Sequence, residues 1–115
     1  MRYLLALLIG TVAACGGGDD GTDAPGSCRA TADALAARNA DCAVESGFID
    51  SGQRQPFYDN FRAGITTTLD CSRMTKILGS PEACVSETNA MPCATFDRAA
   101  QFLPLPASCK GLYGK

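Results

Sequence analysis

Cysteine is the residue type whose number and spacing suggest the clearest chemistry in this chain of 115 residues. Six of the seven cysteines are spread over the chain after residue 26: Cys28, Cys42, Cys71, Cys84, Cys93 and Cys109. An even number of cysteines in a small domain outside the cytoplasm is typical of disulfide bonds. Zinc and thioredoxin-like sites need histidine or Cys-x-x-Cys spacing, and the sequence has neither. The sequence therefore predicts three disulfides, with no metal site and no cofactor.

The seventh cysteine, Cys15, lies in a context that indicates export. It follows a positive charge at Arg2, an apolar or small stretch over 4–14 and, within that stretch, Val-Ala-Ala at 12–14. A charged start, a short apolar segment and small residues before the cut are typical of an export signal. A cysteine directly after Val-Ala-Ala matches the lipobox, in which signal peptidase II cuts before a lipidated cysteine. We therefore expect residues 1–14 to be removed as a signal peptide and Cys15 to be lipidated. The alternative is an ordinary secretory peptide with an incidental cysteine.

This lipid is the membrane anchor that the sequence predicts. The apolar stretch 4–14 is much shorter than the ~20 residues of a membrane-spanning helix. Acyl chains on Cys15 would hold the protein instead, because each buried methylene contributes about 0.8 kcal/mol. Gly16 rather than aspartate follows the cysteine, which favours outer-membrane sorting in enteric bacteria. We therefore expect an extracytoplasmic, lipid-anchored protein on the periplasmic or cell-surface side of the outer membrane.

Composition divides the rest of the chain into a tether and one domain. Residues 15–26 are rich in glycine and aspartate and should form a flexible tether. Residues 27–115 have the length of one small domain, which disulfides would stabilise. Arg2 is the one basic residue of the signal, so nine basic residues oppose 12 acidic ones after its removal. This net negative charge argues against a nucleic-acid partner.

Helical spacing and capping signals predict an all-α domain, a small disulfide-stapled bundle of about four short helices. The first helix should cover 28–43, after the N-cap candidate Ser27. Apolar and small residues form one stripe along it: Cys28, Ala32, Leu35, Ala36, Cys42 and Ala43. Asn39 lies in that stripe and needs a hydrogen-bond partner if it is buried. A satisfied amide in the core is favoured over a contact to a ligand.

The second half of the domain carries three further helix signals. Apolar residues at spacing four predict a helix over 56–69: Phe57, Phe61, Ile65 and Leu69. Ser80, followed by a proline and a glutamate, is a strong helix start, and this helix should end near residue 89. We also expect a short helical turn over 72–78 and a fourth helix over 93–102, and no β-strand.

Antiparallel packing of neighbouring helices selects one pattern among the 15 possible disulfide pairings. The end of the second helix would lie beside the start of the first. The residue after the third helix would lie at the other end of the first, and a returning fourth helix would bring the last cysteine to the third. This arrangement predicts the pairs Cys28–Cys71, Cys42–Cys93 and Cys84–Cys109.

The order of these features is similar to that of a known group of proteins. A lipobox and a Gly/Asp tether precede a helical domain with three late cysteine motifs: Ala83-Cys84, Pro92-Cys93 and Pro106-Ala107-Ser108-Cys109. This succession resembles the small cysteine-rich predicted lipoproteins of myxobacteria and their relatives. The chain departs from them by having no cysteine between Cys42 and Cys71. The resemblance implies a location in the cell envelope and a helical fold, and it implies no catalytic residue.

Carboxylates are the remaining candidates for catalysis. Asp41, Glu45 and Asp50 could form a cluster that divides acid and base roles, as in glycoside hydrolysis. A solvated helix end is the simpler interpretation of these three residues. A serine nucleophile would lack a histidine partner, and the chain has no Gly-x-Ser-x-Gly motif. We therefore expect no catalytic residue and no enzymatic activity.

Two aromatic residues lead to two non-catalytic hypotheses. Phe48 and Tyr58 fall outside the predicted core stripe and could face a partner, although core packing is the simpler interpretation. The first hypothesis is a display module that binds an envelope protein, peptidoglycan or an extracellular ligand. The alternative is a carrier for a small molecule or lipid, with an apolar cavity near these two residues. A cavity of at least ~300 Å³ would favour the carrier, and a filled core would favour the display module.

Overall fold

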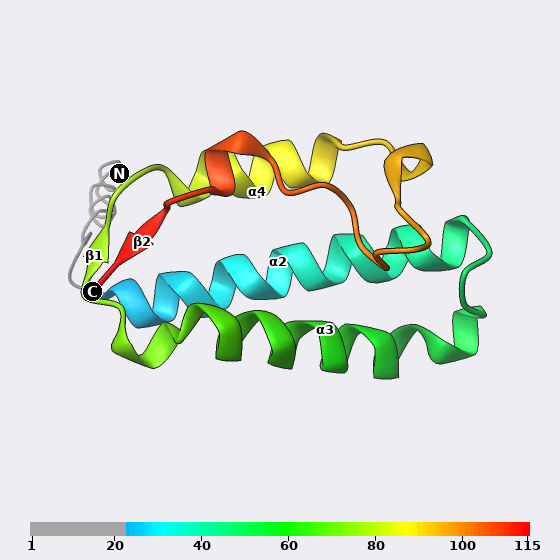
Figure 1. Cartoon of the computed structure of the whole chain (residues 1–115), viewed down its shortest axis with the longest axis horizontal. Helices are drawn as coiled ribbons and strands as arrows, with labels where there is room; N and C mark the ends of the chain where they lie inside the picture. Colours follow the sequence, from blue (N-terminus) through cyan, green and yellow to red (C-terminus); the bar gives the residue numbers. More distant parts are fainter. Residues whose placement is uncertain (1–22) are drawn as a thin grey trace, which may run out of the picture.

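The computed structural model describes residues 23–115. Its described part contains three α-helices, α2 (Ala24–Glu45), α3 (Arg54–Leu69) and α4 (Pro81–Ala90), and one small sheet. The helix α2 lies in the middle, with antiparallel α3 on one side and α4 on the other (Figure 1). The predicted helical, disulfide-linked bundle is confirmed, with three helices in residues 23–115 rather than four.

The first helix begins earlier than the sequence predicted. Asp23 is its N-cap, and the Asp23 carboxylate accepts a hydrogen bond of 3.2 Å from the amide of Gly26. Pro25 fits the first turn, where a missing N–H leaves no bond unmade. A Cβ atom at position 26 would collide with the Asp23 carboxylate, so glycine permits this close cap. Residues 24–26, assigned above to the tether, are therefore part of α2.

Disulfides hold both ends of α2 and the chain terminus in place. The predicted pairing is confirmed. The Cα–Cα distances are 5.4 Å for Cys28–Cys71, 4.8 Å for Cys42–Cys93 and 4.7 Å for Cys84–Cys109. A buried cluster surrounds each of the first two bonds. One contains Cys42, Phe96 and Leu103, and the other contains Cys28 and Met74. The core is thus divided between the two ends of α2.

The expected fourth helix over 93–102 is wrong. A 3-10 turn covers Cys93–Thr95, and an isolated bridge then joins Asp97 to Phe102. The Asp97 side chain accepts hydrogen bonds from the amides of residues 99 and 100, at 2.9 and 3.1 Å. This local bonding competes with a helix, and Gln101 leaves the helical region altogether at φ +68°. A loop rather than a helix therefore leads to the C-terminal 3-10 turn, Ala107–Cys109.

The helical turn expected over 72–78 is limited to a 3-10 turn at its start, and the expectation of no strand is wrong. After α3, a 3-10 turn over Cys71–Arg73 leads to strand β1 (Lys76–Ile77). Strand β1 pairs in antiparallel fashion with β2 (Tyr113–Gly114), with Ile77 opposite Tyr113. Two residues are too few to show the alternation by which a strand is recognised in a sequence. The sheet brings the end of the chain next to the start of α2 (Figure 1).

Among the described residues, none of the helices has the length and apolar character required to span a membrane.

Candidate ligand-binding cavity

An open cavity of about 720 Å³ lies between α2, α3 and the C-terminal part of the chain. One face of α2 and one face of α3 supply two of its walls: Thr31, Leu35 and Asn39 from α2, and Asn60, Phe61, Gly64, Ile65, Thr68 and Leu69 from α3. The other walls come from Met74, from α4 and from the chain after it: Thr88, Met91, residues 100–106, Cys109 and residues 111–113. Most of these side chains are apolar, so the cavity presents an apolar surface to whatever enters it.

Within residues 23–115, α3 packs against a helix on one side, that of α2. The apolar stripe predicted for this helix is present, but no residue of α3 is fully buried. Phe61, Ile65 and Leu69 are half-buried and line the cavity, and Leu69 also packs against the core cluster of Cys28 and Met74. Gly64 lies in the middle of this stripe, and a Cβ atom built there would meet nothing within 4 Å. Gly64 lines the cavity, so its missing side chain leaves this part of the wall open.

Asn39 fixes the opposite wall. Its side-chain amide, 3% exposed, donates a hydrogen bond of 2.8 Å to the carbonyl of Leu35. The amide of Leu103 donates a hydrogen bond of 2.6 Å to the Asn39 Oδ1 atom. The prediction of a satisfied amide is confirmed, and its partner is the C-terminal segment. This segment cannot be helical around Pro104 and Pro106, and the bond from Leu103 holds it over α2.

A cluster of hydroxyl groups lies at one end of the cavity. The Tyr113 hydroxyl is 2.8 Å from Ser27 Oγ and 2.7 Å from Thr31 Oγ1. Tyr113 reaches α2 because β2 pairs with β1 beside the Cys28–Cys71 disulfide. Thr31 and Tyr113 both line the cavity, so the cluster forms part of the wall at this end. We call Ser27, Thr31 and Tyr113 the hydroxyl cluster.

Side-chain amides lie at the other end. Asn60 and Gln101 are exposed there, and a smaller hollow of about 290 Å³ adjoins the cavity beside them. Phe102 and Leu105, 45% and 47% exposed, also line the cavity. The strained backbone of Gln101 belongs to the turn that carries this rim. This end is therefore the more open one.

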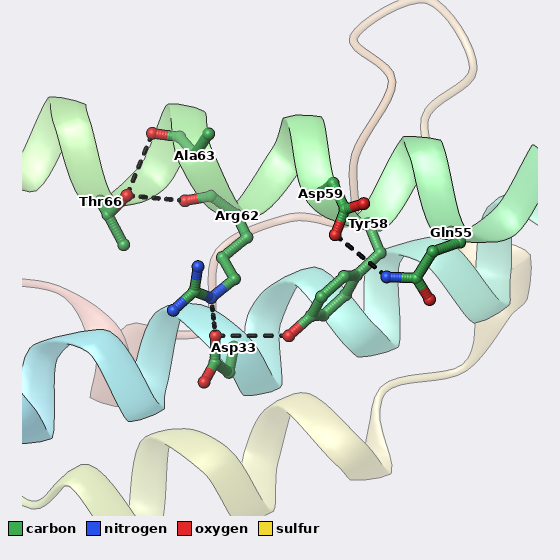
Figure 2. A network of polar contacts seen from close by, with 7 residues as sticks. All are labelled: Asp33, Gln55, Tyr58, Asp59, Arg62, Ala63 and Thr66. Carbon is green, nitrogen blue, oxygen red and sulfur yellow. Dashed lines mark hydrogen bonds and ion pairs between the residues drawn. The ribbon is translucent and has the colours of Figure 1, made fainter.

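Charged residues lie outside the cavity, along the outer contact between α2 and α3. Asp33 on α2 forms an ion pair with Arg62, and its carboxylate accepts a hydrogen bond of 3.3 Å from the Tyr58 hydroxyl (Figure 2). Burial, followed by the charge of Asp33, raises the pKa of Tyr58 above its ordinary value. The hydrogen bond that the Tyr58 hydroxyl donates to Asp33 raises the pKa of Tyr58 further, because it favours the neutral phenol. These contacts hold α3 on α2 and leave the cavity face free of charge.

The two aromatic residues singled out in the sequence do not line the cavity. Phe48 packs against Phe96 and Phe57, with ring centroids 5.8 and 6.4 Å apart, and the Arg98 guanidinium lies 5.9 Å from its ring. Tyr58 is half-buried at the outer contact with Asp33. The cavity that was expected near Phe48 and Tyr58 is lined instead by other residues of α3, among them Phe61 and Ile65. Cys15, the signal peptide and the tether residues 15–22 lie outside the described residues.

The three candidate carboxylates are not brought together into a site. Asp41 forms an exposed ion pair of 2.6 Å with Arg54. Asp50 begins a short 3-10 turn, where its amide donates to the Gln53 side chain. Glu45 is exposed at the end of α2. Within residues 23–115, no three His, Cys, Asp or Glu side chains are grouped as metal ligands would be.

Sequence reasoning missed most of the residues that line the cavity. The signal that could have found them is a glycine at the centre of an apolar stripe, because Gly64 interrupts the face that carries Phe61 and Ile65. A second signal is the Leu-Pro-Leu-Pro segment at 103–106, which cannot donate a full set of backbone bonds and so must be held by a side chain. Comparison of the chain with protein-family models, with curated proteins and with solved structures finds no significant match.

Proposed function

We propose that this protein is a non-catalytic, extracytoplasmic binding module for a small apolar molecule, held at a membrane by a lipid on Cys15. The observation that carries the proposal is the open apolar cavity of about 720 Å³. This volume falls within the ~300–1,000 Å³ of typical small-molecule sites. It exceeds the threshold set above for choosing the carrier over the display module.

Exposed apolar side chains support the same choice. The large exposed apolar residues of the described chain are Leu78, Phe102 and Leu105. Two of them, Phe102 and Leu105, line the cavity, so their exposure is explained by a ligand that enters between them. Leu78 is then the one large exposed apolar residue of the described chain outside the cavity, and a single exposed leucine is ordinary on a protein surface.

Apolar contact and a preformed site would provide the affinity. Each 100 Å² of apolar surface removed from water contributes about 2.5 kcal/mol. Two disulfides fix the ends of α2, and the Asn39–Leu103 hydrogen bond fixes the opposite wall. Binding therefore requires little ordering of the protein, which lowers its entropic cost.

Attachment to a membrane is consistent with this use. Disulfides persist in oxidising compartments outside the cytoplasm, where a lipidated Cys15 would place the domain within a short tether of a bilayer. Bilayers are the main cellular reservoir of apolar molecules. A carrier on such a tether would take its ligand from the membrane surface or deliver it there, without performing a reaction.

The binding half of the proposal is tested with the hydrocarbon fluorophore diphenylhexatriene, whose emission rises in apolar surroundings. The full chain is exported with Cys15→Ser, so that no acyl chain of its own competes with the probe. We expect saturable binding that is lost in Gly64→Phe, since position 64 lies on the cavity wall with open space before it.

Ala63→Phe is the matched control, because Ala63 is the exposed neighbour of Gly64 and does not line the cavity. This variant should bind the fluorophore like the unsubstituted chain. Equal binding by both phenylalanine variants, or none by the unsubstituted chain, would contradict the proposal.

The anchoring half is tested by the intact mass of the native chain from membranes, before and after reduction with thiol labelling. We expect a lipid adduct on a chain that begins at Cys15, and six thiols that become reactive after reduction. An unmodified Cys15 would show that the protein is secreted without an anchor.

A further inference from the structure

The described residues that line the cavity carry no charge. Neither wall contributes an Asp, Glu, Lys or Arg side chain, and the amides of Asn60 and Gln101 are the polar groups at the open end. The charged residues next to the walls are paired with one another: Arg62 with Asp33 on the outer contact of the helices (Figure 2), and Asp70 with Lys115 and Arg73 beyond Leu69. A carboxylate or ammonium group taken into this space would find no counter-ion among the lining residues, and burying an unpaired ion is very unfavourable.

The hydroxyl cluster retains unused hydrogen-bonding capacity. Each of the three hydroxyl groups brings one proton and two acceptor lone pairs. The two contacts of Tyr113, to Ser27 and Thr31, use two of the three protons. Among the described residues, these oxygens make no other side-chain hydrogen bond, so one proton and several lone pairs remain. Thr31 is 4% exposed, whereas Tyr113 is half-buried and lines the cavity, so Tyr113 is the member of the cluster that offers this capacity to a ligand.

The shape of the cavity limits the ligand as well. From Thr31 to Asn39, the α2 wall advances by eight residue steps, or about 12 Å at 1.5 Å per step. The helix α3 runs antiparallel to α2 (Figure 1). Leu69 and Tyr113 pack against the same core cluster, so Leu69 lies toward the hydroxyl cluster, and Asn60 lines the smaller hollow with Gln101 at the open end. Between these ends the walls are apolar, with Leu35, Phe61 and Ile65. An elongated molecule with one polar end matches this arrangement.

We propose that the ligand is an uncharged, elongated apolar molecule with a hydroxyl or carbonyl group at one end, which the Tyr113–Thr31–Ser27 cluster binds. This inference rests on the proposed function and specifies the chemical class of its ligand. Tyr113 and its partner Thr31 are then specificity-determining residues, since their hydroxyl groups offer an alcohol a hydrogen bond that a hydrocarbon of the same length cannot form.

The test uses three compounds with the same ten-carbon chain, which are 1-decanol, decanoate and decylammonium. Each one displaces diphenylhexatriene from the Cys15→Ser full chain at about pH 8, where the carboxylate and the ammonium group are both ionised. We expect decanol to compete at a concentration at least about tenfold lower than either ion, since the ions lack a partner. Equal competition by all three compounds would overturn the inference while leaving the proposed function intact.

The assignment to the hydroxyl cluster is tested with Tyr113→Phe. Loss of one hydrogen bond should weaken decanol about three- to tenfold, with no change in the affinity for the hydrocarbon fluorophore. Tyr58→Phe is the control, because it removes a tyrosine hydroxyl that lies outside the cavity. Since Tyr113 also holds β2 to α2, Thr31→Val is a second variant that removes a hydroxyl while preserving the size of the side chain.

Unchanged decanol affinity in both cavity variants would overturn the assignment. No binding of diphenylhexatriene by the unsubstituted chain would overturn the proposed function and this inference with it. The two failures are therefore distinguishable.

Discussion

The helices α2 and α3 lie side by side, yet they are buried very differently. Ten of the 22 residues of α2 are buried, whereas none of the 16 residues of α3 is. The helix α2 has neighbours on both sides and a disulfide at each end. Within residues 23–115, the helix α3 has one helical neighbour, and part of its apolar face lines the cavity. An apolar stripe therefore indicates a face that avoids water, but it does not indicate what covers that face.

Side-chain size reinforces the difference. The buried face of α2 contains small residues such as Ala32, Ala36 and Ala40, each 0% exposed, which allow other elements to approach closely. The exposed part of the apolar face belongs to large residues of α3, among them Phe61 and Ile65. The rigid half of the molecule is thus built from small residues and disulfides. The half that could bind a ligand is built from large side chains around a glycine.

Removal of a disulfide should lower the free energy of unfolding more than the other changes below, because it releases an end of α2. Cys42→Ser combined with Cys93→Ser opens a link across 51 residues. On the chain-entropy model, the free energy of unfolding should fall by about 4 kcal/mol. Urea denaturation measures the change. The corresponding pair at Cys84 and Cys109 closes 25 residues and should cost somewhat less. Equal midpoints for both double variants and the unsubstituted chain would contradict the structural role of the bonds.

Enlargement of one residue on each helix compares the two faces directly. Ala36→Phe should destabilise the protein by about 1–3 kcal/mol or more, since a buried position with no free space is overpacked. Gly64→Phe should leave the stability unchanged or raise it by up to ~0.5 kcal/mol, because glycine is a poor helix former. The measurement is the midpoint of thermal or urea unfolding. A loss of similar size in both variants would mean that the space beside Gly64 is already filled.

Asn39→Leu should have a smaller effect, because it breaks one connection between α2 and the cavity wall. The substitution keeps the volume of the side chain but leaves the buried amide of Leu103 without its acceptor. The expected loss is about 1–3 kcal/mol, together with faster hydrogen exchange at the Leu103 amide. Asn60→Leu is the control, since Asn60 is exposed on α3. Unchanged exchange at Leu103 would show that Asn39 does not hold the segment.

The smallest expected effect is a shift in the pKa of Tyr58, at the outer contact of α2 and α3. Tyr58 should ionise above its ordinary pKa, because burial and then Asp33 disfavour the phenolate. The stability associated with the neutral phenol is complete below about pH 10 and is lost as the pH rises through the raised pKa. Absorbance titration, with Tyr58→Phe as the blank, measures this pKa. Asp33→Asn should lower it more than Asp59→Asn does, since Asp59 contributes least. The opposite order would contradict the contacts in Figure 2.

The framework of the fold could be predicted from the sequence because its signals are local. Periodicity and caps located the three helices, and antiparallel packing of the first two led to the pairing of Cys28 with Cys71. The fourth helix failed because the Asp97 side chain bonds to the backbone ahead of it, which propensity alone does not reveal. The return of Cys109 to Cys84 is nevertheless made, by an extended segment that the prolines permit.

The site was harder to predict, because its hollow depends on tertiary packing. The sequence identified Asn39 as a buried amide in need of a partner, but that partner, Leu103, is 64 residues away. It pointed to Phe48 and Tyr58 as the cavity region, whereas Phe48 packs into a core cluster and Tyr58 bonds to Asp33. Apolar residues recur at helical spacing both on the buried face of α2 and on the partly uncovered face of α3. Coverage by a neighbouring element made the difference.

The most direct test of the cavity is an NMR titration of the Cys15→Ser chain, labelled at isoleucine δ1 methyl groups, with 1-decanol. Within residues 23–115, Ile65 lines the cavity, whereas Ile49 and Ile77 pack against the two core clusters. We predict a saturable shift and intermolecular NOEs at the Ile65 methyl group, with little change at the other two. A silent Ile65 at saturating decanol, or equal shifts at all three methyl groups, would contradict a ligand-binding cavity between α2 and α3.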